Sequence, residues 1–514
     1  MKTYKILWAD DEIDMLKSHI LFIQEKGYEV TPVISGQDAI ECFKEQNFDI
    51  VFIDEHMPGI SGLQTLDQLK KINPDIPVIM ITKSEDEGIM TDAIGKQIAD
   101  YLIKPVNPNQ ILLSLKKNLH KEDIVSEAVL AGYRNEFLRI NEQINNAANH
   151  DDWYSIYRKI IDWELNLAES QSPLLDSLLT QKEDATNIFG KYVRMNYENW
   201  IQGQTAAPLL SHQIFEQKVI PLLKEGEKVF FILIDNFRFD QWLIIKDLIS
   251  ASFTTHEDYH CSILPTATQY ARNAVFAGLL PAEIKKRFPT CWIEENDERR
   301  KNDFEEELLK NLLERNKIST PFTYHKISSP GKNGHSVKDI HSLKNNSLNI
   351  IVLNFIDMLS HARTSSDMIK ELSSDEAAYR SLTRSWFQHS GILEMIKEIG
   401  RTGAKIILTS DHGTIRVKKS LKIIGDRDMN TNLRYKVGRN IQYDRKKVFD
   451  VLKPENIGLP VTNISSKYIF ACGDDFFVYP NDAQHYASHF TDTFQHGGIS
   501  LEEMIVPLIT MTPK

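Results

Sequence analysis

The sequence predicts an α/β protein with a doubly wound five-stranded first domain, a helical middle and a C-terminal α/β domain with a mostly parallel central sheet. Short apolar runs alternate with helical periodicity over residues 1–119, strand-like runs are missing from about 120 to 205, and long apolar runs return after 225. At 514 residues the chain is too long for one core. We therefore expect domains at 1–120, 121–208 and 209–514.

The composition is that of an ordinary globular chain with acidic character. Apolar residues make up 42% and charged residues 25%, and the formal net charge is −11. This charge argues against a dedicated DNA-binding protein, because phosphate backbones are bound by basic surfaces. Four scattered cysteines without a CxxC pair indicate a reducing compartment. Because the sequence shows no apolar signal segment and no long apolar run, we expect a cytoplasmic protein with no membrane partner.

Five apolar runs predict the strands of the first domain: "YKILWA", "EVTPVI", "FDIVFID", "IPVIMIT" and "ADYLI". Strands that alternate with helices form a parallel sheet covered on both faces, and function gathers at the carboxyl ends of its strands. Asp10, Asp11, Asp54, Thr82 and Lys104 all follow or end such runs. Three converging carboxylates repel one another and need a cation, and oxygen ligands suggest Mg²⁺.

Over its full length this domain resembles a response-regulator receiver domain. The resemblance implies that Asp54, in "FIDEHMPGISG", is the phospho-acceptor. Asp11 and Asp54, helped by Asp10, would hold the Mg²⁺. His56, where many receivers have other residues, would add its backbone carbonyl. The alternative is a receiver-like scaffold that is not phosphorylated.

The same resemblance implies a switch and a phosphodonor. Thr82 and Tyr101 match the switch positions, and Lys104 would bind the phosphoryl group beside a typically cis peptide to Pro105. A sensor histidine kinase would supply the phosphate.

The middle of the chain is predicted to be a helical bundle. "EAVLAGYRNEFLRINEQI" and "WYSIYRKIIDWEL" place apolar residues at helical spacing. The aromatic stripe of Trp153, Tyr154, Tyr157 and Trp163 indicates a core rather than a ligand box.

Aspartate and histidine recur where the apolar runs of the last domain end. Alone, such an aspartate is usually a helix cap and such a histidine a structural residue. Here the pattern repeats in order, and six Asp/His ligands suit two metal ions better than one. If a helix begins near "FIDMLSH", its carboxylate and imidazole, four residues apart, share one face. The candidate ligands are Asp235, Asp357, His361, Asp411, His412 and His496.

A threonine pair precedes the helical run "QYARNAVFAGLL". A hydroxyl side chain at a helix N-terminus lies where exposed N–H groups favour an anion such as phosphate. Thr266 and Thr268 are the candidates, and the alternative is that both merely cap this helix.

Residues 225–514 resemble the alkaline phosphatase superfamily, specifically its PglZ branch, and the motif order also matches the nucleotide pyrophosphatase/phosphodiesterases. The resemblance implies two Zn²⁺ ions, although Mn²⁺ also suits the ligands. Thr268 would be the nucleophile, because its spacing to Gly278 fits the phosphodiesterase pattern better than that of Thr266. One ion would be held by Asp235, Thr268, Asp411 and His412, and the other by Asp357, His361 and His496.

This ligand set predicts an in-line displacement. Two ions ~4 Å apart can clamp the attacking and leaving oxygens, and a threonine hydroxyl with a lowered pKa would form a phosphothreonine that water releases. Arg272, one helical turn beyond Thr268, would either contact phosphate oxygens or lie exposed on the surface.

A basic segment lies between two of the candidate ligands. Residues 416–447 hold 11 Lys/Arg against 3 Asp. We expect this segment to overhang the site and bind a polyanion through Arg434, Tyr435, Lys436 and Tyr443. The alternatives are a solvated basic surface or a contact for the acidic receiver. Phosphodiesters, with nucleotides or short oligonucleotides favoured, are therefore the expected substrates.

The order of receiver, helices and PglZ domain resembles the PorX family of response regulators, which is associated with type IX secretion. This resemblance implies a sensor kinase and an extracytoplasmic-function sigma factor as partners, and a homodimer on phosphorylation. A second hypothesis is a phospho-regulated interaction module that binds a sigma factor, with a mainly structural metal site. A DNA-binding regulator is not favoured, because no helix-turn-helix pattern follows the receiver.

Overall fold

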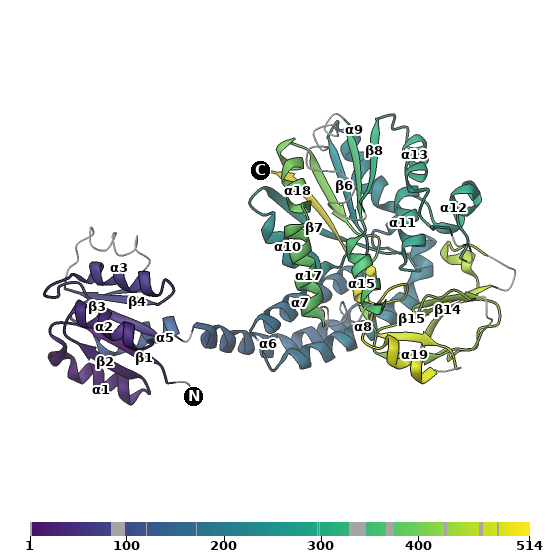
Figure 1. Cartoon of the computed structure of the whole chain (residues 1–514). Coiled ribbons are helices and arrows are strands. Elements are labelled where there is room, and N and C mark those ends of the chain that lie inside the picture. The colour runs from purple at the N-terminus through teal and green to yellow at the C-terminus, as the bar shows by residue number, and fades with distance from the viewer. Residues whose placement is uncertain are drawn as a thin grey trace. The chain divides into compact units, whose positions relative to one another are not determined.

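The computed structural model describes residues 3–83, 98–119, 121–170, 172–295, 297, 299–327, 346–365, 375–425, 429–461, 466–480 and 483–514. The chain divides into two units, residues 1–132 and 133–514 (Figure 1). None of the described helices has both the length and the apolar character that crossing a membrane requires.

The first unit contains a five-stranded parallel sheet in the order β2-β1-β3-β4-β5, which confirms the predicted doubly wound fold. One apolar core packs α1 and α5 against one face of the sheet, and a second core packs α2 and α3 against the other. The strands are β1 (Lys5–Ala9), β2 (Glu29–Val33), β3 (Ile50–Asp54), β4 (Val78–Thr82) and β5 (Asp100–Ile103). The helices are α1 (Lys17–Glu25), α2 (Gly36–Glu45), α3 (Gly62–Ile72) and α5 (Pro108–Leu119).

Three long helices follow: α6 (Lys121–Asn146), α7 (His150–Glu169) and α8 (Leu175–Ile201). Helix α7 begins with a capping box, in which Asn149 and Asp152 each accept a backbone N–H of the other. Trp153 on α7 is 1% exposed and packs against Phe189 of α8 at a centroid distance of 5.5 Å. The aromatic stripe is therefore a core, as predicted.

A six-stranded sheet in the order β7-β18-β10-β6-β9-β8 forms the centre of the second unit. Four neighbouring strands are parallel, and β18 runs antiparallel to both of its neighbours, which confirms a mostly parallel sheet. Its strands are β6 (Val229–Ile234), β7 (Phe253–Cys261), β8 (Phe322–Ile327), β9 (Leu348–Leu353), β10 (Lys405–Thr409) and β18 (Ile505–Pro513).

Helices flank this sheet, with α10 and α18 on one side and α11 and α13 on the other in Figure 1. Their bounds are α10 (Phe239–Ile245), α11 (Thr268–Ala277), α13 (Glu305–Arg315), α15 (Phe355–Ser365), α17 (Glu376–His389) and α18 (Ile392–Arg401).

Small sheets occupy the chain between β10 and β18. Strand β13 (Tyr435–Gly438) pairs with β15 (Lys467–Ala471), which also pairs with β14 (Val448–Val451). A separate apolar core supports these strands. The remaining short strands are β11 (Ile415–Arg416), β12 (Lys419–Lys422), β16 (Asp475–Val478) and β17 (Phe494–Gln495).

Candidate active site

The first group of predicted ligands lies at the carboxyl ends of two central strands. Asp235 follows β6, and Asp411 and His412 follow β10 after Ser410. Because β6 and β10 are parallel neighbours, these ends meet. The Nε2 of His412 lies 3.9 Å from Asp235 Oδ1 and 3.7 Å from Asp411 Oδ2. All three side chains are buried, and their ligand atoms lie within 4.8 Å of one another.

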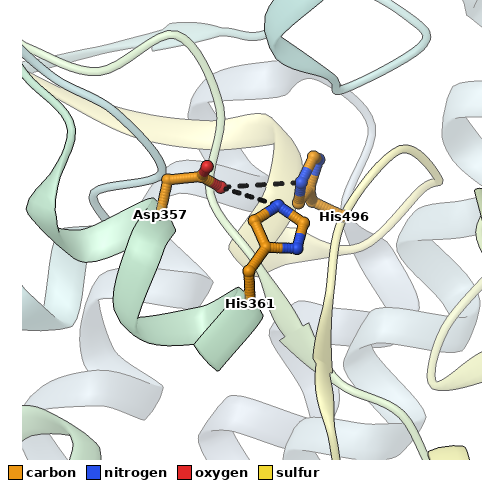
Figure 2. Close-up of side chains that lie close together, drawn as sticks. All are labelled: Asp357, His361 and His496. Atoms are coloured by element: carbon orange, nitrogen blue, oxygen red, sulfur yellow. Dashed lines mark ion pairs between the residues drawn. The ribbon is translucent and has the colours of Figure 1, made fainter. Parts of the chain in front are cut away.

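The second group comes from α15 and the segment after β17. Figure 2 shows the Nε2 atoms of His361 and His496 facing Asp357 Oδ1, at 3.4 and 3.7 Å. Strand β9 ends at Leu353, so Asp357 lies in the first turn of α15 rather than at the strand end. The helical spacing of Asp357 and His361 is as predicted. The rings of His412 and His496 stack with centroids 4.3 Å apart, so the two groups are neighbours.

Backbone contacts orient the ligand side chains. The Nδ1 of His412 lies 3.1 Å from the carbonyl oxygen of Gly413, and the Nδ1 of His496 lies 3.2 Å from that of Thr266. Because a carbonyl only accepts, each Nδ1 carries the proton and each Nε2 turns an unprotonated lone pair toward the cluster. Gly413 is required here, since a Cβ would lie 2.0 Å from the carbonyl oxygen of Glu502.

Asn236 joins the two groups. Its backbone N–H donates to Asp411 Oδ1 at 3.2 Å, and its side-chain Nδ2 donates to Asp357 Oδ1 at 3.4 Å. Its φ of 62° lies in the left-handed region, which asparagine tolerates better than most residues. The sequence offered no signal for this role.

The donor set fits divalent metal ions. Asp411 Oδ2 is buried and has no hydrogen-bond partner among the described residues, as expected of a ligand atom. Burial lowers the pKa of His496 to about 3 and also lowers that of His412, so both rings stay neutral, which is the form that binds metal. Burial would raise the pKa of Asp357, but the hydrogen bond and charge of His361 hold it below its usual range. Three carboxylates and three imidazoles suit Zn²⁺ or Mn²⁺.

Thr268 is the first residue of α11, directly beside the first ligand group. Its Oγ1 lies 3.4 Å from Asp235 Oδ1 and 3.1 Å from His412 Nε2. The N-cap residue, Ala267, offers no side-chain cap to the first amides of the helix. Thr266, by contrast, is fully buried, and its hydroxyl donates to Gly498 O and accepts from Gly497 N. Of the two threonines, only Thr268 lines the cavity beside the ligands.

Arg272 is buried, which contradicts the alternative that it lies exposed on the surface, whereas its contact with phosphate oxygens stays a prediction. Its Nη1 lies 2.8 Å from Asp235 Oδ2, and its Nε lies 2.7 Å from Glu305 Oε1. It is not among the described residues that line the cavity. Arg272 therefore orients the candidate ligand Asp235 through its Oδ2 atom without lining the cavity itself. Its partner Glu305, far away in sequence, carried no motif that could have identified it.

A cavity of about 870 Å³ opens beside Thr268, His361 and His496. The basic segment contributes to its wall as expected, but with neutral side chains, listed here as Met429, Asn430, Thr431, Asn432, Leu433 and Tyr435. Residues 426–428 of this segment lie outside the described residues.

The expectation that Arg434 and Lys436 bind a polyanion is wrong. Arg434 is fully buried and pairs with Glu503 at 2.6 Å, and Lys436 is 1% exposed and donates to Asn430 O. Neighbouring residues in a strand face opposite sides, so when Tyr435 faces the cavity these two cations point away from it. Tyr443 also lies elsewhere, where it donates to Asp450 Oδ2 at 3.0 Å.

The first unit gathers its predicted site at the carboxyl ends of β1, β3, β4 and β5. Ligand atoms of Asp10, Asp11 and Asp54 lie within 4.8 Å of one another. The Nζ of Lys104 lies 2.7 Å from Asp10 Oδ2 and 2.6 Å from Asp54 Oδ2. Burial raises the pKa of Asp10, and the hydrogen bond from Lys104 opposes this shift.

The switch positions adjoin this cluster. Thr82 Oγ1 lies 3.4 Å from His56 Nδ1, and Tyr101 is half-buried on β5. The Lys104–Pro105 peptide bond is cis, as expected.

Three family models match successive parts of the chain. A response regulator receiver domain matches residues 6–116, a PorX response regulator linker domain matches 123–201, and a BREX system PglZ alkaline phosphatase-like domain matches 214–511.

Two curated relatives each match about a quarter of the chain. The transcriptional regulatory protein ZraR of Escherichia coli K12 is 34% identical over 129 residues, which are 24% of this chain and 29% of that protein. The alginate biosynthesis transcriptional regulatory protein AlgB of Pseudomonas syringae is 32% identical over 115 residues, 22% of this chain and 26% of that protein. The chain thus spans less than a third of these curated relatives.

Among solved structures, a CheY-like receiver domain from Methanospirillum hungatei is 24% identical, with a TM-score of 0.23, and covers 23% of this chain and 96% of that chain. The PglZ match extends over more than half of the 514 residues. The chain belongs to the PglZ family, and it carries this domain in a PorX-like response regulator, behind a receiver domain and a linker domain.

Proposed function

We propose that this response regulator is a metal-dependent phosphodiesterase in which Thr268 is the nucleophile. The observation that carries the proposal is the position of the Thr268 hydroxyl, 3.1 Å from His412 Nε2 and 3.4 Å from Asp235 Oδ1, on the wall of a cavity of about 870 Å³. A nucleophile beside metal-ligand atoms and an open cavity is the arrangement that phosphoryl transfer needs.

The roles of the ligand residues follow from the two groups. Asp235, Asp411 and His412, with Thr268, would hold one Zn²⁺, and Asp357, His361 and His496 would hold the other. When bound, two such ions supply Lewis acidity that lowers the pKa of a hydroxyl and offsets charge on phosphate oxygens.

The chain's own groups then position the reaction. Asp235 and His412 direct the Thr268 oxygen, which attacks phosphorus while the bond from phosphorus to the leaving oxygen breaks, and the hydroxyl proton ends on the leaving alcohol. The first amides of α11 face a phosphate there, because the helix has no side-chain cap. Water then hydrolyses the phosphothreonine and restores the hydroxyl.

The side chains that line the cavity indicate the class of substrate. Tyr435 and Phe490 offer rings for stacking, and Gln269, Asn430 and Asn432 offer amides that both donate and accept. These groups suit nucleotides or short oligonucleotides, whereas the burial of Arg434 and Lys436 removes the earlier reason for favouring a long polyanion.

The first unit would receive the signal. We propose that the protein is cytoplasmic and that a sensor histidine kinase phosphorylates Asp54, with Mg²⁺ held by Asp10, Asp11, Asp54 and the carbonyl of His56. Lys104, already 2.6 Å from Asp54, would bind the phosphoryl group, and Thr82 and Tyr101 would follow. We further propose that segments 1–120, 121–208 and 209–514 act as input, linker and output in the control of type IX secretion, with an extracytoplasmic-function sigma factor as partner.

We expect purified protein to carry about two zinc ions per chain and to hydrolyse bis-p-nitrophenyl phosphate. Thr268→Ala should lower turnover by at least ~100-fold because it removes the nucleophile, and Thr268→Ser, which keeps a hydroxyl, should retain more of it. Elemental analysis and the ester assay on the same samples check this. Folded protein without metal would refute the two-metal site, and bound zinc without turnover would favour the sigma-factor-binding module instead.

A further inference from the structure

One carboxylate, Glu295, lies in the wall of the cavity, which Lys301 also lines. Glu295 is the only acidic residue among the described residues that line the cavity, and no described cation forms an ion pair with it. A carboxylate repels a phosphodiester, so its place in a cavity that receives phosphate needs another explanation.

Two tyrosines hold this carboxylate in one orientation. The hydroxyl of Tyr270 donates to Glu295 Oε1 at 2.6 Å, and the hydroxyl of Tyr435 donates to the same atom at 2.8 Å. Burial raises the pKa of both tyrosines, so both remain protonated donors. Two hydrogen bonds to one oxygen fix the rotation of the Glu295 carboxylate.

The backbone that carries Glu295 is fixed as well. Lys301 donates from Nζ to the carbonyl oxygens of Glu294, Glu295 and Asp297, so its ammonium group binds the chain and not the Glu295 carboxylate. No described residue donates a side-chain hydrogen bond to Glu295 Oε2, and the residue is half-buried. This oxygen therefore remains available to a ligand in the cavity.

A molecule that binds to such a carboxylate must carry N–H donors. Guanine presents two adjacent donors, N1–H and the amino group, to a carboxylate, whereas cytosine and adenine present one amino group. Thymine and uracil place their single N–H between two carbonyl oxygens, which a carboxylate repels.

We propose that Glu295, oriented by Tyr270 and Tyr435, is a specificity-determining residue that binds the N–H donors of a nucleobase and favours guanine over thymine or uracil. This inference rests on the proposed phosphodiesterase function, because it assigns the organic part of the ester. Glu295 does not take part in the displacement itself.

The test compares three p-nitrophenyl esters: guanosine 5′-phosphate p-nitrophenyl ester, its thymidine counterpart and bis-p-nitrophenyl phosphate, which has no base. For the wild type we expect kcat/KM to be higher for the guanosine ester than for the thymidine ester. In Glu295→Gln the ratio of kcat/KM for the guanosine ester to that for bis-p-nitrophenyl phosphate should fall about 10-fold, the size of one hydrogen bond to a charged group.

Glu294→Gln is the matched control, because its exposed carboxylate pairs with Lys285 outside the cavity. This variant should keep the wild-type ratio. Glu295→Asp should recover part of the preference. Calorimetric binding of guanosine and uridine monophosphates gives a second measurement, in which Glu295→Gln should lose the difference between them.

An unchanged ratio in Glu295→Gln, or equal affinity of the wild type for the two monophosphates, would overturn the inference. Failure of the proposed function is a separate result, namely absence of wild-type turnover on all three esters. Equal loss by Glu294→Gln would also overturn the inference, since it would assign the effect to general negative charge.

Discussion

At the scale of single residues, Arg272 supplies a positive charge to the candidate metal site. Its Nη1 contacts Asp235 Oδ2 at 2.8 Å, which leaves Oδ1 of the same carboxylate facing Thr268. Burial raises the pKa of Asp235 and of Asp411, and the charge of Arg272 opposes both shifts. Arg272 thus favours the ionised form of both carboxylates and orients Asp235 before any metal binds.

We expect Arg272→Met to weaken zinc binding about 10-fold or more, because Asp235 loses the contact that orients it. The variant should also lose ~3 kcal/mol of folding stability, since the Glu305 carboxylate is left buried without this partner. Chelator competition and urea unfolding measure the two effects. Arg272→Lys, which keeps the charge but loses the planar fork, should lie between. Zinc affinity equal to wild type in the Met variant would contradict the orienting role.

The buried side chain of Lys436 predicts how folding stability depends on pH. Burial lowers its pKa from 10.5 to about 8, so the unfolded chain holds this proton more tightly than the folded one. Burying the charged form of Lys436 lowers the free energy of unfolding. This loss is present in full below pH 8 and disappears as the pH rises from about 8 toward 10.5. This change corresponds to ~3 kcal/mol.

Wild type should therefore gain stability relative to Lys436→Met between pH 8 and pH 10, because methionine has no proton to lose. Urea unfolding of the C-terminal domain at several pH values measures the difference. Lys422→Met, at an exposed lysine of the same segment, is the control and should give no such gain. Parallel curves for wild type and Lys436→Met would disprove the assignment.

At the scale of elements, buried charges join the linker helices to the PglZ domain. Lys182 on α8 lies 3.0 Å from Glu164 on α7 and 3.0 Å from Glu502, and Arg380 on α17 lies 2.6 Å from Glu164. Arg238 continues the network to Glu376 and Asp240 and donates to the carbonyl of Thr414, two residues beyond His412. Separating these helices would leave charges buried without partners, so α7, α8 and the central sheet form one body.

The elements that the sequence predicts well are those with a local signal. Both sheets follow from apolar runs, and the candidate ligands follow because aspartate and histidine recur where such runs end. The side chains that it predicts poorly depend on contacts between distant segments. Arg434 is buried in an ion pair with Glu503, and Arg272 is buried in ion pairs with Asp235 and Glu305. Counting charges along the sequence could not show that these two arginines would be buried. Glu295 had no motif at all, and only the fold places it in the wall of the cavity that Thr268 also lines.

At the scale of the whole molecule, the proposed phosphorylation site and the candidate active site belong to different units of the chain. A change at Asp54 can affect the PglZ domain only if the two receiver states differ in their contacts with the rest of the chain or with a second subunit. Receivers commonly use such contacts to dimerise.

We therefore expect beryllofluoride to shift wild-type protein from monomer toward dimer in analytical ultracentrifugation. Asp54→Ala should abolish the shift while leaving zinc bound, and Thr268→Ala should remove turnover while still dimerising, because the two sites are separate. A sedimentation coefficient unchanged by beryllofluoride would refute phosphorylation-driven dimerisation. Failure of Thr268→Ala to dimerise would show that the switch and the active site are not independent.

The buried guanidinium beside Asp235 also bears on how the protein matures in the cell. Zinc-finger domains stay unfolded until metal arrives, because nothing else brings their ligands together. Here an arginine from the chain already balances part of the carboxylate charge, and a complete sheet carries the ligands. We expect newly made protein to fold first and acquire metal afterwards, so that the zinc supply of the cell would determine how many folded molecules are active rather than how many molecules fold.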